Sequence, residues 1–260
     1  MHYLKRKRVI SWALYDWANS AFATTVMAGF FPLFFKSFWA ADLSPAESTA
    51  VIGTTNSLAG LLIMLLAPIL GAYSDLGKLK KKFLAFFALL GVSSTGYLYF
   101  IPQGDWVIAA SLYALAVIGF SGGNIFYDSL IVSVSKQEQR HKVSSLGFSM
   151  GYLGGGLLFV INVLMYLNPA WFGLSSQSEA ILWSFLSVAI WWVVFSLPLF
   201  MSVEEKSNTE ISKGLFENIT EAFKAVVSTL REIKKHKRVA IFLIAYWLYI
   251  DGVDTIVRMA

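Results

Sequence analysis

Polar side chains that could handle a solute or a proton interrupt two stretches that otherwise have the composition of membrane-spanning helices. The first stretch carries Asp16 and Asn19, three residues apart, and the second carries Asn124, Tyr127 and Asp128. Inserting a charged side chain at the bilayer centre costs about 2.5 to 3.5 kcal/mol, so such residues usually face a bundle interior or a water-filled cavity. The pattern indicates a pathway for a polar solute, with Asp16 or Asp128 as candidate carrier of a coupling proton.

A third apolar stretch repeats the pattern with Asp251, Asp254 and Arg258, which share one helical face. Acidic residues therefore recur in the first, fourth and seventh predicted spans. This spacing predicts three-helix units whose first members line one cavity. Asp128 has an alternative position in the headgroup zone at the end of its helix, because Lys136 follows closely.

The composition predicts an all-α integral membrane protein. Hydrophobic residues make up 57% of the chain and charged residues 14%, far from the balance of a soluble domain. Six uncharged runs reach spanning length, and a seventh begins at Val239; the six are 17–35, 48–74, 83–104, 106–127, 143–178 and 180–203. The long fifth run predicts a helix that ends near Leu167, because Asn168-Pro169 and a polar loop follow it.

The net charge of +5 reports topology rather than nucleic-acid binding. Basic residues gather before the first span, between the second and third spans, between the fourth and fifth spans, and in 203–238. The loops on the other side of the membrane hold Lys36 as their one basic residue. By the positive-inside rule, the N-terminus is predicted to be cytoplasmic. We expect three parts: a six-helix bundle over 1–202, a cytoplasmic linker with an amphipathic helix over 203–238, and a seventh transmembrane helix over 239–260.

Other site chemistries find little support in the sequence. The chain has no cysteine, and His2, His141 and His236 lie in hydrophilic segments, so we expect no metal site and no cofactor. No nucleophile and base share a plausible helical face. We therefore expect a protein that is not an enzyme.

The connection between the second and third spans carries Gly71, Asp75 and Lys78 within a basic cluster. This arrangement resembles the signature loop of the major facilitator superfamily, although Leu76 stands where that family has a basic residue and Gly77 comes one place early. In that family the loop aspartate meets the N-terminal end of a helix from the other half, a favourable dipole contact. The alternative is a basic loop with an incidental aspartate.

The fifth span begins with Gly147, Gly151 and Gly155, a GxxxGxxxG ridge that permits close helix packing. The strings Tyr15-Asp16-Trp17-Ala18-Asn19-Ser20 and Val143-Ser144-Ser145-Leu146-Gly147 resemble the vacuole effluxer branch of the superfamily. That branch comprises autophagy-related amino-acid effluxers of fungi and their bacterial relatives. The resemblance implies a multi-pass protein of the bacterial cytoplasmic membrane.

Together, residues and resemblance predict a secondary active transporter that moves small polar solutes, amino acids by resemblance, by alternating access. The expected partners are the solute, protons and the lipid bilayer, and no nucleic acid. The fold would be the six-helix N-terminal half of a major facilitator plus a seventh helix, with the C-terminal half missing. Two alternatives remain open: a non-transporting assembly or scaffold protein, and a non-functional fragment of a transporter.

Overall fold

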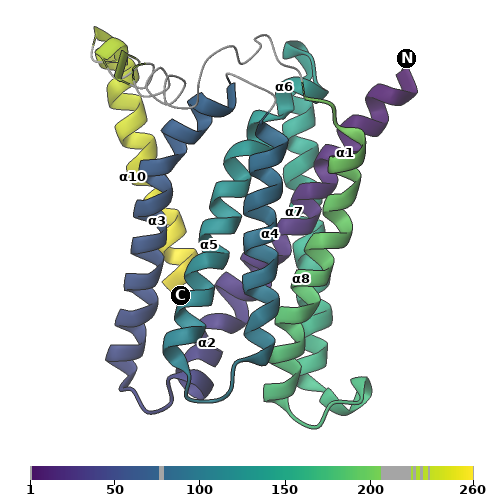
Figure 1. Ribbon diagram of the computed structural model, residues 1–260, viewed down its shortest axis with the longest axis vertical. Helices are drawn as coiled ribbons and strands as arrows, with labels where there is room; N and C mark the ends of the chain where they lie inside the picture. Colours follow the sequence, from purple (N-terminus) through teal and green to yellow (C-terminus); the bar gives the residue numbers. More distant parts are fainter. Residues whose placement is uncertain are drawn as a thin grey trace.

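The computed structural model describes residues 2–75, 79–205, 224, 227–228, 231–233 and 235–259. Within these residues the chain forms helices and no strand, and six helices are long and apolar enough to cross a membrane. The predicted all-α membrane fold with six spans is confirmed. The long helices run side by side as a bundle, and the N-terminus and α6 lie at the same end of it (Figure 1).

The helices follow the predicted spans closely. They are α1 His2–Ala21, η1 Phe22–Phe30, α2 Phe31–Phe34, η2 Phe35–Trp39, α3 Pro45–Asp75, α4 Lys80–Tyr97, η3 Leu98–Phe100, α5 Trp106–Ser129, α6 Ile131–Val134, η4 Gln137–Gln139, α7 Arg140–Leu167, η5 Pro169–Phe172, α8 Gln177–Ser202 and α10 Lys237–Met259. The end of α7 at Leu167 confirms the predicted helix end. Helix α10 begins two residues before the expected Val239. The proposed amphipathic helix of the linker lies mostly outside the described residues.

The first span is continuous but not uniformly α-helical. Two π-helical segments, η1 and η2, lie on either side of the short α2 that contains Pro32. Phe31 donates its backbone N–H to the carbonyl of Val26, five residues earlier. Pro32 itself has no N–H to donate, which favours a local departure from α-helical bonding.

The start of α3 carries a capping box between Ser44 and Glu47. The Glu47 carboxylate accepts hydrogen bonds from the Ser44 backbone N–H at 2.9 Å and from its hydroxyl at 2.7 Å, while the Glu47 N–H donates to Ser44 Oγ at 3.3 Å. These bonds satisfy backbone donors that a helix start would otherwise leave open. Helix α3 therefore begins cleanly at Pro45.

Helix α1 lies against both α7 and α8, which together position the first span. Aromatic side chains fill the core around it. Phe31 stacks on Tyr113 of α5 with ring centroids 3.8 Å apart, and Phe22 lies 5.8 Å from Trp192 of α8. All four are buried. This core fixes the first span against α5, α7 and α8.

Large apolar side chains cover the outside of the bundle. On α3, Leu58, Met64 and Leu65 are more than half exposed, and on α10 so are Phe242 and Trp247. Such surfaces are stable in lipid, where apolar side chains need no cover from water. The exposed faces agree with a multi-pass membrane protein.

Candidate functional site

A cavity of about 360 Å³ between α1, α5 and α7 brings together four of the residues singled out in the sequence. Asp16 comes from α1, and Asn124, Tyr127 and Asp128 come from the last turns of α5. The cavity is lined by Trp12, Asp16, Asn124, Tyr127, Asp128, Ile131, Ser144 and Phe148. Two carboxylates separated by more than a hundred residues thus face one space, which we call the acidic pocket.

Asn19 joins the same group through a hydrogen bond to the pocket lining. Its amide nitrogen donates to Asn124 Oδ1 at 2.5 Å, and only 1% of the residue is exposed. Among the described residues, Asn19 Oδ1 has no hydrogen-bond partner. Buried polar atoms are normally paired, so this unpaired oxygen marks a departure from ordinary helix packing beside the pocket. The bond also fixes α1 against α5.

Asp16 is held on its own helix by Ser20, whose hydroxyl donates to Asp16 Oδ1 at 3.0 Å. The two side chains lie one helical turn apart, the spacing at which helix side chains meet. Ser20 therefore restricts the rotamers of the carboxylate and leaves its other oxygen open to further interactions. This role of Ser20 was not predicted from the sequence.

Aromatic stacking orients Tyr127. Trp12 lies nearly parallel to the Tyr127 ring, with centroids 4.5 Å apart, and donates its indole N–H to the Tyr127 carbonyl at 3.0 Å. Tyr15 also stacks on the Tyr127 ring, with centroids 5.1 Å apart. The Tyr127 hydroxyl is buried and has no hydrogen-bond partner among the described residues. Trp12 and Tyr15 thus hold the tyrosine ring in place.

The glycine ridge of α7 lies against α1 along this site. A Cβ at Gly147 would come within 2.9 Å of Trp12 and of the Tyr127 hydroxyl, and one at Gly151 would lie 2.9 Å from the Asp16 carboxyl carbon. At Gly155, Thr24 donates its hydroxyl to the glycine carbonyl at 3.2 Å. Missing side chains on α7 therefore make room for the polar side chains of α1.

The remaining predicted residues are not brought into the acidic pocket by the described part of the chain. Gly71 lies on α3 with open space around it. Asp75 is the last residue of α3, and Asp251 and Asp254 lie on α10, but the side chains of these three aspartates lie outside the described residues. Lys78 lies wholly outside them. Their roles stay predictions.

A polar clasp that was not predicted from the sequence joins α4 to the end of α8 and the residues after it. The Glu205 carboxylate accepts from the backbone N–H groups of Lys80 at 2.8 Å and Lys81 at 3.3 Å. Lys81 Nζ donates in return to the carbonyls of Phe200 and Val203, both at 2.8 Å. The carboxylate thus caps the positive start of α4, and the ammonium caps the negative end of α8.

Comparison with known proteins agrees with this architecture. The model of the family described as vacuole effluxer Atg22-like matches residues 45–260. An MFS-type transporter of Bacillus subtilis, YxiO, is 38% identical over 98% of this chain and 59% of its own length. An autophagy-related protein 22 of Yarrowia lipolytica is 23% identical over 44% of this chain and 22% of its own.

A further relative, from Aquifex aeolicus, is 23% identical over 98% of this chain and 57% of its own length. The chain therefore spans less than two thirds of the curated relatives that it matches over nearly all its length. The family match covers well over half of the chain. The resemblance found in the sequence is confirmed, and the chain belongs to the vacuole effluxer Atg22-like family.

Proposed function

We propose that the chain is part of a secondary active transporter of small polar solutes, with amino acids as the substrate class. The acidic pocket is the observation that carries this proposal, because Asp16 of α1 and Asp128 of α5 face one cavity. Carboxylates bind an ammonium group by charge-assisted hydrogen bonds. Asn124 and Ser144 line the same space and offer hydrogen-bonding groups to the rest of the solute.

The names of the relatives support transport as the activity. The Bacillus protein is named an MFS-type transporter, and the matched family is described as vacuole effluxers. In such a carrier the six-helix bundle would rock against a second bundle around a site near the membrane midplane. We propose that α10 begins this second bundle, that Asp251 and Asp254 face the pathway from it, and that Gly71, Asp75 and Lys78 form the loop that changes conformation.

The proposed setting is a bacterial cytoplasmic membrane with the N-terminus inside. The distribution of basic residues supports this orientation. Asp16 or Asp128 would carry a coupling proton, since each is an ionisable group inside a span and faces a cavity. We infer no catalytic reaction, because the pocket binds and releases its solute unchanged.

The test is uptake by reconstituted protein. Residues 1–260 would be placed in liposomes alone and together with the separately expressed remaining segment of the Bacillus relative, and uptake of a mixture of labelled amino acids would be measured. We expect flux from the combined protein only. Asp16→Asn should abolish most of it while folding persists, because the amide has the same shape and is less costly to bury.

Asp105→Asn is the matched control, since Asp105 is an exposed aspartate in a loop and its side chain caps no helix. Flux that survives Asp16→Asn would remove the acidic pocket from the mechanism. Flux from residues 1–260 alone would show that copies of the chain form the carrier. Folded protein without flux in any arrangement would instead favour an assembly role.

A further inference from the structure

A second and larger cavity lies where α1 begins, beyond the acidic pocket. Its volume is about 730 Å³, and its walls come from the start of α1, from α6 and the turn after it, and from α7. It is lined by Arg6, Arg8, Val9, Ile10, Ser133, Val134, Ser135, Lys136, Gln139 and Leu146. We call it the basic cavity, since three of these residues are cations and none is acidic.

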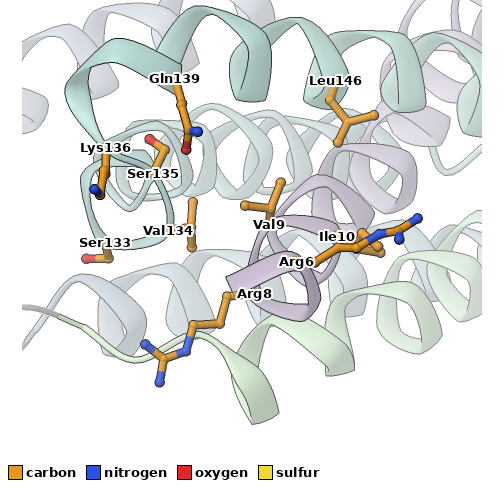
Figure 2. A pocket seen from close by; sticks show the side chains of 10 residues that line it. All are labelled: Arg6, Arg8, Val9, Ile10, Ser133, Val134, Ser135, Lys136, Gln139 and Leu146. Atoms are coloured by element: carbon orange, nitrogen blue, oxygen red, sulfur yellow. The ribbon is translucent and has the colours of Figure 1, made fainter. Parts of the chain in front are cut away.

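The cations around the basic cavity are not equivalent. Arg8 is committed to an ion pair with Glu204 at 2.6 Å, and Figure 2 shows its guanidinium directed away from the other lining side chains. Arg6 and Lys136 stand on opposite sides of the view (Figure 2). Among the described residues neither of these two forms an ion pair, and both are exposed. Two cations without an acidic partner among the described residues make the cavity attractive to an anion.

The middle of the basic cavity is apolar. Val9 and Val134 lie between the two cations, and Leu146 points toward them from α7 (Figure 2). Val134 is 8% exposed, so it forms part of a firm floor. A small soluble anion would leave this surface wet, whereas an amphiphile would cover it and gain from removing apolar area from water. The lining therefore fits a ligand with an anionic head and an apolar body.

The depth of the basic cavity agrees with such a ligand. Arg6 is the first residue of the first candidate span, and Lys136 lies between the span that ends at Val134 and the span that begins at Gln137. Both cations therefore lie at the boundary between apolar helix and water, which is where lipid headgroups lie. Basic pockets between helices at this depth are suited to anionic headgroups.

We propose that the basic cavity binds an anionic phospholipid, with the headgroup attracted by the positive charges of Arg6 and Lys136 at the two edges of the cavity and the first acyl carbons against Val9, Val134 and Leu146. Gln139 supplies neutral N–H donors for the headgroup on the same side of the cavity as Lys136. This proposal goes beyond transport, since it needs only the folded bundle and a membrane. Its failure would leave the acidic pocket untouched.

The test is lipid binding to the purified chain, measured by native mass spectrometry after adding phosphatidylglycerol or phosphatidylcholine. We expect phosphatidylglycerol to bind more tightly. The double variant Arg6→Gln/Lys136→Gln should lose roughly tenfold or more of that affinity, since a basic residue near an anionic surface contributes about 1 kcal/mol. The matched control is Lys7→Gln/Lys142→Gln, which removes two exposed cations from α1 and α7 outside the cavity.

A second variant distinguishes lipid binding from the binding of a free anion. Leu146→Gln should weaken phosphatidylglycerol binding several-fold, whereas Leu153→Gln, an exposed position of α7 outside the cavity, should not. Inorganic phosphate at millimolar concentration should raise the thermal midpoint of the chain less than phosphatidylglycerol does. Equal affinity for the two lipids, equal loss in the Lys7/Lys142 control, or a response to phosphate that matches the response to lipid would each overturn the proposal.

Discussion

Replacing Gly151 with alanine tests whether the α1–α7 contact is as close as the polar site requires. The added Cβ would lie 2.7 Å from Ser20 Oγ and 2.9 Å from the Asp16 carboxyl carbon, whereas ordinary contacts begin near 3.4 Å. Ser20 and Asp16 are hydrogen-bonded to each other at 3.0 Å, so turning either side chain aside breaks that bond. Relieving the contact means losing the bond or separating the helices by about half an ångström, and overpacking of this kind costs about 1 to 3 kcal/mol.

Gly156→Ala provides the control on the same helix, since nothing lies within 4 Å of the position that its Cβ would take. An alanine there should be neutral or slightly stabilising, because glycine is a poorer helix former by about 1 kcal/mol. Thermal unfolding of both variants in detergent would be compared, and we expect a lower midpoint for Gly151→Ala by several degrees. Equal midpoints for the two variants would refute the close contact and place the ridge against lipid.

Three further outcomes are expected. Asn19→Leu should lower stability by about 1 kcal/mol in thermal unfolding, because it removes the hydrogen bond to the partly buried amide of Asn124 on α5, and a wild-type midpoint would contradict this. Glu205→Gln should cost about 1 kcal/mol by weakening the clasp, whereas Glu204→Gln, which removes an exposed ion pair, should change little; the reverse order would refute the clasp. In this cysteine-free chain, Ser135→Cys should react with an impermeant thiol reagent only from the cytoplasmic side and Ser176→Cys only from outside; the opposite labelling would invert the topology.

The spans were predictable because each is a local signal, a continuous apolar run between polar stops. The end of α7 at Leu167 was an equally local signal, and it was confirmed. The pattern of polar residues alone selected Asp16, Asn124 and Asp128, which the structure brings together. These residues could be selected because burying a polar side chain in a span is energetically costly, so such a residue needs a partner or a cavity.

Contacts between distant segments could not be predicted. Glu205 caps a helix that begins 125 residues earlier, and nothing in its neighbourhood in the sequence marks it as a cap. Ser144 and Phe148 of the acidic pocket carry no charge and lie in a run that first indicated packing. The role of Ser20 depends on a rotamer that packing decides. Such assignments need the arrangement of the helices in space, which local patterns in one sequence do not reveal.

The π-helical segment η1 changes which side of the first span faces inward. Counting on from Trp12 by alternating steps of three and four residues would place Leu33 in the core, as in a regular α-helix. Leu33 is instead 69% exposed, while Phe31 and Trp39 are buried. The wider turns of η1 accommodate one extra residue, which changes the positions after it that face the core. Winding η1 as a regular α-helix with all its residues kept would turn Leu33 inward and Trp39 outward, so the aromatic half of the core depends on an insertion that no single side chain reveals.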